Sequence, residues 1–360
     1  MHILKPQPSN LNPVYFSSMA HQSLYRAYRP KSFGELIGQE QVVRPLEEQL
    51  KTKKIGHAYL FAGSRGLGKT SVARIFAREA GCTEKDLYEI DAASHNSVED
   101  IRALNEGVYT LPFESPYKVY ILDEAHMLSK GAWNAFLKTL EEPPSYALFI
   151  LATTELEKVP ETVQSRCQIF TFKKPSRAGL AKLVATVAKK EGCVIEPAAA
   201  DLVALLADSS YRDALSVLEK VLSVSRDKKL TLEETEKATG APKRTLVAAL
   251  VKALSEGKAG EALAAIRAAA DGGVDMILYL SLVLDYVRAV LLVRHAPELH
   301  MKLKEELGTD EYGEVEVLAN AANSKVTHLT LKTFLDAASR IRYAPVPALP
   351  LELAVYELSS

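Results

Sequence analysis

The first half of the chain alternates short apolar runs with longer segments in which apolar residues recur every three or four positions. The short runs are rich in Val, Ile, Tyr and Phe and therefore predict strands. The five predicted strands are HAYLFA (57–62), LYEID (87–91), KVYILD (118–123), ALFILATT (147–154) and CQIFTF (167–172). Segments of helical length lie between them, including one from Lys69 to Ala80 that Gly81 ends. Because strands and helices alternate, and the strands are apolar along their whole length, the pattern predicts a parallel sheet covered by helices on both faces.

The pattern changes after Pro175, where the strand signals stop. Helical spacing predicts one helix ended by Gly192, a second that begins at Pro197 and a third over residues 211–223. A polar and charged stretch then indicates a boundary near residue 240, beyond which the chain is rich in Ala and Leu and helical to its end. The predicted parts are a flexible N-terminal tail (1–22), an α/β domain (23–173), a small helical domain (174–239) and a larger helical domain (240–360).

The apolar segments do not favour a membrane protein. The longest, Met276 to Val293, contains Asp285 and Arg288, which lie three residues apart on one helix face. This spacing favours a buried helix of a multi-helix domain. The first twenty residues contain three prolines and no apolar core of signal-peptide length, so we expect a loosely attached tail, with Met19 as an alternative start.

Composition adds two constraints. Forty-four Lys and Arg residues against 45 Asp and Glu residues give a formal net charge of −1, so any nucleic-acid binding must come from a local surface. The three cysteines, Cys82, Cys167 and Cys193, are far apart in sequence and form no CxxC pair. This spacing disfavours both a four-cysteine zinc site and a disulfide framework, and it fits a reducing compartment.

The segment GSRGLGKT, from Gly63 to Thr70, has the spacing of a phosphate-binding loop, or P-loop. A predicted strand ends immediately before it and a predicted helix begins at Lys69, as this motif requires. Glycines allow backbone N–H groups to converge on phosphate oxygens at the positive end of the helix. Lys69 is then expected to reach the β- and γ-phosphates and the Thr70 hydroxyl to hold Mg²⁺.

The segment VYILDEAH places two adjacent carboxylates at the end of a predicted strand. Asp123 is expected to bind Mg²⁺, and Glu124 to orient the water that attacks the nucleotide. The letters DEAH also occur in helicases, but a helicase of that type needs a second domain with its own strands. The helical sequence after residue 172 disfavours that interpretation.

Three further residues are candidates for sensing or stabilising the nucleotide. Thr153 and Thr154 end the fourth predicted strand, where a hydroxyl is able to contact the γ-phosphate and a water molecule. Arg166, immediately before the last predicted strand, is a candidate arginine finger for a neighbouring subunit's nucleotide.

These residues resemble one family, the gamma/tau subunit of bacterial DNA polymerase III, which is the AAA+ motor of the clamp loader. The resemblance spans about residues 23–360. The segments that carry it are LYRAYRPKSFGELIGQEQV, GSRGLGKTSVARIFA, EIDAASHNSVEDIR, KVYILDEAHMLSKGAWNAFLKTLEEPP, FILATTELEKVPETVQSRCQIF, YRDALSVLEK and LPLELAVYEL. It implies an AAA+ P-loop domain, a helical lid domain and an all-α collar domain that mediates oligomerisation.

The resemblance also implies roles for individual residues. Tyr25, Arg26 and the Ile37-Gly38-Gln39 turn would border the adenine, one of the two threonines would be the first sensor, and Arg212 would be the second sensor on a lid helix. Glu124, Lys69, Thr153, Thr154 and Arg166 are then the catalytic candidates, and Thr70 and Asp123 the Mg²⁺ ligands. The nucleotide-binding candidates are Tyr25, Arg26, Gly38, Gly63, Arg65, Gly66, Gly68, Lys69, Thr70, Ser71 and Arg212.

The chain departs from the family pattern in two places. Family members usually carry a four-cysteine zinc module after the P-loop helix, whereas here Gly81 to Asp86 leads directly into the second strand, so we expect no zinc site. Ser209 stands where the family favours glycine, which puts the placement of the following helix in doubt. Because the sequence ends after the predicted collar, we expect a gamma-like form without the tau extension.

The function implied is that of an ATP-driven motor that uses ATP and Mg²⁺ to load a sliding clamp onto primed DNA. Expected partners are the delta and delta-prime subunits, further copies of this chain, the clamp, primed DNA and, indirectly, the single-strand-binding machinery, in the cytoplasm at the nucleoid. Ser97 and Asp100 predict a capping box at a helix start that would face DNA. The alternatives are another AAA+ DNA-remodelling motor and a clamp-loader stator that does not hydrolyse ATP.

Overall fold

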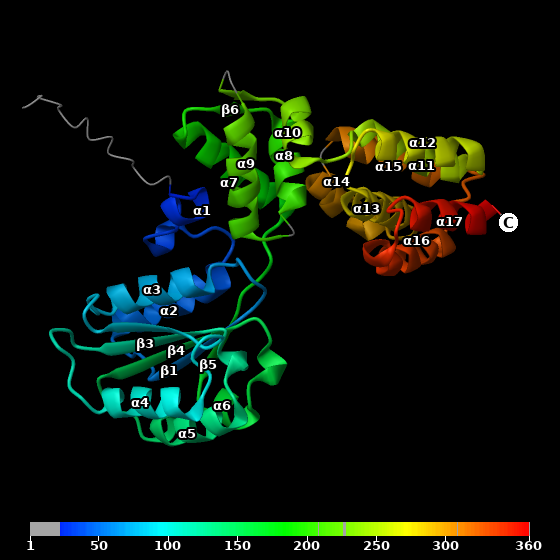
Figure 1. Ribbon diagram of the computed structural model, residues 1–360. Coiled ribbons are helices and arrows are strands. Elements are labelled where there is room, and N and C mark those ends of the chain that lie inside the picture. Colours follow the sequence, from blue (N-terminus) through cyan, green and yellow to red (C-terminus); the bar gives the residue numbers. More distant parts are fainter. Residues whose placement is uncertain (1–21, 208, 226–227, 308, 360) are drawn as a thin grey trace, which may run out of the picture.

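The computed structural model describes residues 22–207, 209–225, 228–307 and 309–359. The tail expected over residues 1–22 therefore lies outside the described residues, except for Gln22. An α/β unit comes first, a small helical unit follows it, and a larger helical unit lies at the C-terminal end (Figure 1). We call the two helical units the lid (α7–α10) and the collar (α11–α17).

The sheet of the α/β unit confirms the predicted strands to within two residues. All of its strands are parallel, and they lie in the order β2-β3-β4-β1-β5. The strands are β1 (Ala58–Ala62), β2 (Leu87–Asp91), β3 (Lys118–Asp123), β4 (Ala147–Thr153) and β5 (Gln168–Thr171). In this order, the three central strands β3, β4 and β1 end side by side at one edge.

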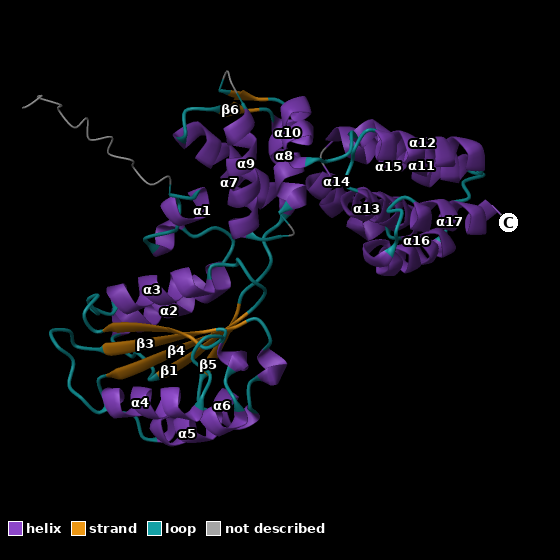
Figure 2. Cartoon of the chain, in the orientation of Figure 1, coloured by secondary structure: helices purple, strands orange, loops and turns teal. Residues whose placement is uncertain are grey.

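Helices cover both faces of the sheet, as expected (Figure 2). One face packs on α2 (Glu40–Thr52) and α3 (Lys69–Glu79). The other packs on α4 (Val98–Val108), α5 (Lys130–Glu141) and α6 (Glu161–Gln164). Side chains alternate between the two layers along each central strand, because successive strand residues point to opposite faces. The short 3₁₀ helices of the described chain are Phe33–Glu35, Ala125–Met127, Leu156–Lys158, Pro297–Leu299 and Ile341–Tyr343.

The expectation that every strand is buried along its length is wrong for the two edge strands. The central strands β1 and β4 are buried throughout, whereas most residues of β2 and β5 are half-buried or exposed. Each edge strand has a neighbour on one side only, so the helical layers cover it incompletely. The predicted helix ends are confirmed: Gly81 and Gly192 have φ values of 91° and 76°, which are typical of residues that terminate helices.

The lid contains α7 (Arg177–Lys190), α8 (Pro197–Leu206), α9 (Tyr211–Val224) and α10 (Leu232–Thr239). The expectation that no strand follows residue 172 is wrong in one detail, because Val194–Ile195 pairs in parallel with Lys229–Leu230. A two-residue ladder is too short to leave a periodic signal. The N-terminal helix α1 (Leu24–Ala27) packs on the lid, where Leu24 is buried in its apolar cluster.

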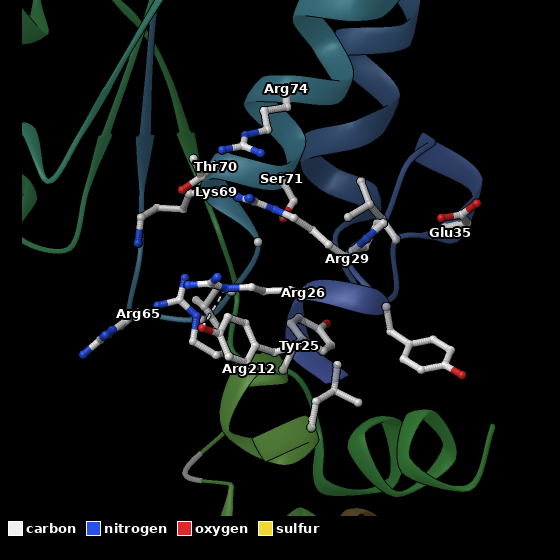
Figure 3. A pocket seen from close by; sticks show the side chains of 18 of the residues that line it. Tyr25, Arg26, Arg29, Glu35, Arg65, Lys69, Thr70, Ser71, Arg74 and Arg212 are labelled. Carbon is white, nitrogen blue, oxygen red and sulfur yellow. Dashed lines mark hydrogen bonds between the residues drawn. The ribbon is translucent and has the colours of Figure 1, made fainter. Parts of the chain in front are cut away.

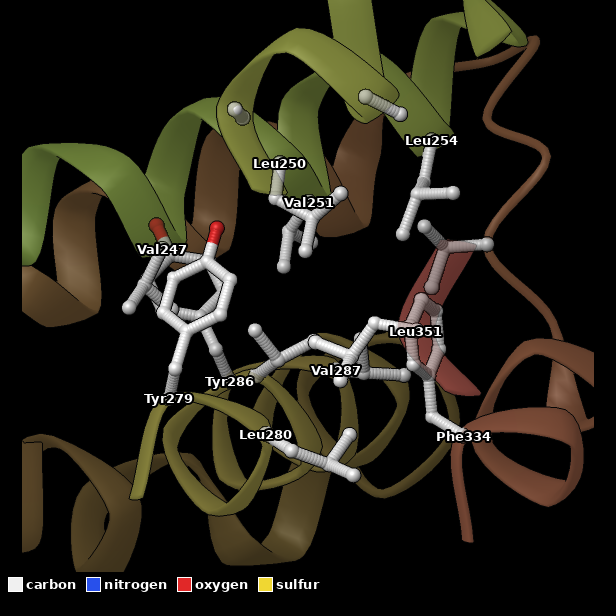
Figure 4. Close-up of a cluster of buried hydrophobic side chains, with 14 of the residues drawn as sticks. Val247, Leu250, Val251, Leu254, Tyr279, Leu280, Tyr286, Val287, Phe334 and Leu351 are labelled. Carbon is white, nitrogen blue, oxygen red and sulfur yellow. The ribbon is translucent and has the colours of Figure 1, made fainter. Parts of the chain in front are cut away.

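The collar is built around α13 (Met276–His295), whose apolar side chains form one core with the surrounding helices (Figure 4). These are α11 (Arg244–Glu256), α12 (Ala259–Asp271), α14 (His300–Leu307), α15 (Thr309–Asn320), α16 (His328–Arg340) and α17 (Leu349–Ser359). Within the described residues, α13 is the one helix long and apolar enough to cross a membrane by length and composition, and half of its most apolar window is buried in the collar. Asp285 and Arg288 lie on its exposed side.

Ion pairs connect the lid to the collar. Arg177 of α7 donates to Asp201 of α8 through Nε at 3.0 Å, and it lies 3.6 Å from the Glu311 carboxylate of α15. Arg244 of α11 pairs with the same carboxylate at 2.5 Å. Burial raises the pKa of Glu311, and the two arginines oppose that effect. One buried carboxylate therefore binds an arginine from each of the two helical units.

Asp86 anchors the loop that precedes β3. Its buried carboxylate accepts backbone N–H bonds from Phe113 at 2.5 Å and from Glu114 and Ser115 at 2.9 Å each. Burial alone would raise the pKa of Asp86, but these donors outweigh it and lower the pKa to about 2. Asp86, the last residue of the short connection between Gly81 and β2, thus fixes the loop over residues 113–115.

We expect Asp86→Asn to lower the free energy of unfolding at pH 7 by about 1–3 kcal/mol, because an amide accepts these bonds less well than a carboxylate. The folded-state pKa is depressed, so this stabilisation is present above the ordinary aspartate pKa of about 4 and is lost as pH falls toward 2. Urea unfolding of wild type and variant at several pH values between 7 and 3 measures the difference. Glu84→Gln, at an exposed neighbouring position, is the control. A difference that stays constant across this range would contradict the role of the charge.

Candidate nucleotide-binding site

A cavity of about 690 Å³ lies where the central strands of the sheet end, and the lid forms its opposite wall (Figure 3). Most of the predicted nucleotide-binding residues line it. Those that do are Tyr25, Arg26, Arg65, Gly66, Gly68, Lys69, Thr70, Ser71, Asp123, Glu124 and Arg212. Gly38, Gly63, Thr153, Thr154 and Arg166 are not among its lining residues. The cavity thus brings together residues that are separated by almost 190 positions in the sequence.

The P-loop wraps the start of α3. Gly68, with a φ of 95°, immediately precedes the first helical residue, Lys69. The ammonium group of Lys69 donates to the carbonyl oxygens of Gly63 at 2.6 Å and Ser64 at 2.9 Å. Burial lowers the pKa of Lys69, while Glu124 and Asp123 counteract that effect. A cation and the N–H groups at a helix start therefore face one cavity, which suits an anionic phosphate group.

Gly66 is the point at which the P-loop contacts the lid. Its carbonyl oxygen accepts the backbone N–H of Tyr211 at 3.2 Å. A Cβ atom at this position would lie 2.0 Å from Ser210 Oγ, and the φ of 77° is itself unfavourable for other residues. Glycine is required here both by the backbone conformation and by the close approach of α9.

Two candidate oxygen ligands for a divalent cation lie side by side. Thr70, in the first turn of α3, donates its hydroxyl hydrogen to the Asp123 carboxylate at 2.8 Å. Asp123 ends β3, and β4 separates β3 from β1 and its P-loop. Hydroxyl and carboxylate oxygens are hard donors of the kind that Mg²⁺ prefers. The pair therefore fits the predicted metal ligands.

Glu124 has a left-handed backbone, with a φ of 47°, which is uncommon for a residue other than glycine. One oxygen of its carboxylate, Oε2, accepts the Thr154 hydroxyl at 3.0 Å. Thr153 is fully buried and contacts His126 and Glu155 instead. Of the two threonines that the sequence left open, Thr154 is the one in contact with the candidate base.

The opposite side of the cavity is formed by the N-terminal segment and α9. Tyr211 donates its hydroxyl hydrogen to the carbonyl oxygen of Ile37, and Gly38 leaves room for this contact. Arg212, in the first turn of α9, lies with its guanidinium carbon 5.7 Å from the centre of the Tyr25 ring. These contacts place the adenine-side candidates and the second-sensor candidate on one wall of the cavity.

Ser209 adopts a left-handed conformation, with a φ of 59°. This backbone explains why glycine suits the position, because a residue without Cβ populates that region without strain. The serine is nevertheless accommodated, and α9 begins two residues later with Ser210 as its N-cap.

Arg166 lies two residues beyond the end of α6 and does not line the cavity. Its guanidinium donates to Glu141 at 2.5 Å and to the backbone oxygen of Thr162 at 2.6 Å, and its side chain is 33% exposed. It has no part in the wall of this chain's own site.

The structure adds cavity residues that sequence reasoning missed. Arg29 donates from Nε to Ser71 Oγ at 2.9 Å, and burial lowers its pKa. Arg74 (Figure 3) pairs with Glu89, and both of these residues line the cavity, as does Tyr211 of the lid. Arg29 follows Arg26 by three residues, but it lies beyond the four-residue helix α1 (Leu24–Ala27), which is too short to leave a periodic signal. The other two depend on contacts between distant segments.

The three cysteines are free and lie in three separate connections between elements, and burial raises the pKa of Cys82 to about 11 and of Cys167 to about 12. Within the described part of the chain, no three His, Cys, Asp or Glu residues gather in a way that could hold a metal ion.

A family model described as DNA polymerase III, delta subunit, matches residues 38–96 and 85–176. A model described as DNA polymerase III subunits gamma and tau domain III matches residues 230–360. The chain is 39% identical to DNA polymerase III subunit tau of Bacillus subtilis, over 81% of this chain and 55% of that protein. It is 30% identical to DNA polymerase III subunit gamma of Buchnera aphidicola, over 94% of this chain and 98% of that protein.

The chain spans about half the length of tau and gamma/tau relatives such as those of Bacillus subtilis and Mycobacterium tuberculosis. Among solved structures, the RuvB Holliday junction branch migration motor of Thermotoga maritima has a similar fold. The TM-score is 0.52 at 23% identity, over 63% of this chain and 79% of that one. The expected fold class, an AAA+ α/β domain followed by helical units, is confirmed.

We expect Glu124→Gln to retain nucleotide binding and to lower ATP hydrolysis by about 10²–10⁴-fold, because the amide no longer acts as a base. Lys69→Ala is the contrasting variant, since loss of the buried ammonium should weaken nucleotide binding itself. Fluorescent-nucleotide titration and phosphate release measure the two properties. Turnover by Glu124→Gln at the wild-type rate would remove Glu124 from the role of base.

Proposed function

Because the chain belongs to the DNA polymerase III gamma/tau family, we propose that it is an ATP-driven motor subunit of a clamp loader. The observation that carries the proposal is the cavity in which Lys69, Thr70, Asp123 and Glu124 converge against the lid. In this proposal, ATP hydrolysis drives the loading of a sliding clamp onto primed DNA.

The proposed roles follow from the positions of the side chains. Lys69, Arg65 and the N–H groups at the start of α3 bind phosphate, with Gly63, Gly66 and Gly68 shaping the loop and Ser71 beside it. Thr70 and Asp123 would hold Mg²⁺, which supplies charge neutralisation of the phosphates. Glu124, held by Thr154, orients the attacking water. The segment around Tyr25, Arg26 and Gly38 borders the adenine, and Arg212 contacts the γ-phosphate.

Hydrolysis is favoured over a stator role by the complete set of polar groups. A subunit that only supports its neighbours needs neither the buried Lys69 nor a carboxylate with a strained backbone at Glu124. The match of residues 230–360 to gamma and tau domain III favours a clamp loader over another DNA-remodelling motor. The similarity to RuvB is a similarity of fold.

The proposed partners are the delta and delta-prime subunits, further copies of this chain, the sliding clamp and primed DNA, in the cytoplasm. Contact with the single-strand-binding machinery would be indirect. The helix start at Ser97 is proposed to face DNA. Its capping box is confirmed, since Ser97 Oγ accepts the Asp100 N–H at 3.1 Å while the Asp100 carboxylate accepts the Ser97 N–H at 3.1 Å.

The proposal predicts that ATP hydrolysis by the assembly of this chain with delta and delta-prime rises when clamp and primed DNA are added together. Clamp retained on circular primed DNA after gel filtration measures loading, which should require ATP. An assembly built with Lys69→Ala should fail to load. Loading at the wild-type level by that assembly would instead support the stator role, and hydrolysis indifferent to clamp and DNA would support another motor.

Arg166 is proposed to act on the nucleotide of a neighbouring subunit, since it lies outside its own cavity while its side chain remains partly exposed. Arg166→Ala should spare nucleotide binding and assembly but lower hydrolysis. A fully effective arginine finger contributes on the order of 10³–10⁵-fold in GTPases, so even a partial role is measurable.

Mixing Arg166→Ala with Glu124→Gln at fixed total protein distinguishes action in trans from action in cis. In mixed assemblies, some sites pair an intact Glu124 with a neighbour's intact Arg166, and activity should partly return. A mixture that stays inactive although sizing shows mixed assemblies would end the proposal for Arg166.

A further inference from the structure

His126 lies behind the candidate base and outside the nucleotide cavity. It belongs to the 3₁₀ helix Ala125–Met127, which directly follows Glu124, and its side chain is only 7% exposed. Its imidazole contacts the residue that follows β3, Glu124, and two residues at or just beyond the end of β4, Thr153 and Glu155. Nδ1 lies 3.1 Å from Thr153 Oγ1 and 3.5 Å from Glu124 Oε2, and Nε2 lies 3.3 Å from Glu155 Oε1. None of the roles proposed above uses this residue.

The hydrogen bonds of Thr153 indicate that Nδ1 of His126 carries a hydrogen. The Thr153 hydroxyl donates its one hydrogen to the Glu155 carbonyl oxygen at 3.2 Å and accepts the Glu155 backbone N–H at 3.0 Å. The hydroxyl has no second hydrogen to give, so in its contact with His126 it accepts and Nδ1 donates. The Glu124 carboxylate near Nδ1 also only accepts, which favours the same Nδ1–H form.

The contacts of Glu124 are concentrated on one of its two oxygens. Oε2 accepts the Thr154 hydroxyl at 3.0 Å and faces Nδ1 of His126. Among the described residues, no hydrogen bond of the structure uses Oε1. A carboxylate held through one oxygen keeps the other available to accept a proton from water, in a direction that the restrained oxygen sets.

We propose that His126 is a positioning residue for Glu124: its Nδ1–H, shared between Thr153 and Glu124 Oε2, fixes the carboxylate at the end of β3 relative to the end of β4. The inference rests on the proposed function, because it gives the base of that reaction its orientation. Thr154 restrains the same oxygen from the adjacent position. The candidate base and the two candidate sensor threonines are therefore one connected unit.

The other charged groups around His126 do not supply this restraint. Glu155 faces Nε2 and is itself paired with Lys158, whose ammonium lies 2.8 Å from Oε2 of Glu155. Glu155 and Lys158 are on the outer side of the imidazole, away from Glu124. Loss of the Nε2 contact should therefore matter less to hydrolysis than loss of the Nδ1 contact.

Three substitutions of His126 distinguish the contribution of Nδ1 from that of Nε2. Asn places an amide N–H near the position of Nδ1, Gln places one near Nε2, and Leu keeps apolar bulk without a donor. We expect His126→Leu and His126→Gln to lower kcat for ATP hydrolysis by about 10–100-fold, with KM for ATP within about twofold of wild type. His126→Asn should recover most of kcat. Wild-type kcat in His126→Leu, or a kcat for His126→Asn as low as that of His126→Leu, would overturn the proposal, as would a loss confined to KM.

A measurement that does not depend on ATP hydrolysis tests the role of His126 separately from the proposed function. Nitrogen NMR of the histidine-labelled full chain reports which imidazole nitrogen is protonated. A protonated Nδ1 on His126, alone or with Nε2 also protonated, supports the proposal, and a bare Nδ1 overturns it. Absence of hydrolysis in the wild-type assembly would contradict the proposed function, whereas the NMR result decides the Nδ1 contact in either case.

Discussion

Parallel pairing of three neighbouring strands is the constraint on which the candidate site depends. Because β3, β4 and β1 run in the same direction and in register, their carboxyl ends meet at one edge of the sheet. The P-loop follows β1, Asp123 ends β3 and Thr153 ends β4. Ligands bind in open α/β sheets at such an edge, where loops from adjacent strands surround a shared space. Burial of the central strands on both faces gives this arrangement its rigidity.

The second constraint is the contact between the P-loop and the lid. The backbone N–H of Tyr211 donates to the Gly66 carbonyl oxygen, and the Ser210 side chain occupies the space that a Cβ atom of residue 66 would need. The loop that is proposed to bind phosphate is therefore in direct contact with the start of α9. A shift of the P-loop at Gly66 therefore displaces the start of α9, because the two backbones are joined by a hydrogen bond and packed together at this point.

The lid in turn contacts the collar through Arg177 and Glu311. A continuous set of contacts thus runs from the P-loop through the lid helices to α15 and α11. Each element of this route is a helix with a packed apolar face, so the route is stiff between its contact points. This connection offers a physical basis for coupling a nucleotide site to an assembly surface, which the proposed motor function requires.

The sequence by itself predicted the strands of the main sheet and most of the residues that line the cavity. Short apolar runs, separated by helical segments that end at glycines, predicted all five strands of the main sheet. The motifs GSRGLGKT and VYILDEAH predicted which residues gather at the carboxyl ends of those strands. These signals are local, since a P-loop requires its glycines and lysine at fixed spacing. Edge-strand exposure and the Val194–Ile195 ladder were not predictable, because both depend on which segments become neighbours.

Only the tertiary structure decided which partners the candidate residues have. It placed Thr154 rather than Thr153 on Glu124, put His126 between two strand ends, and packed the N-terminal helix on the lid. It also showed Arg166 outside its own cavity, bound to Glu141. Such contacts join residues far apart in the sequence through the register of parallel strands and the crossing of helices. That geometry follows from packing the whole chain, which no single segment encodes.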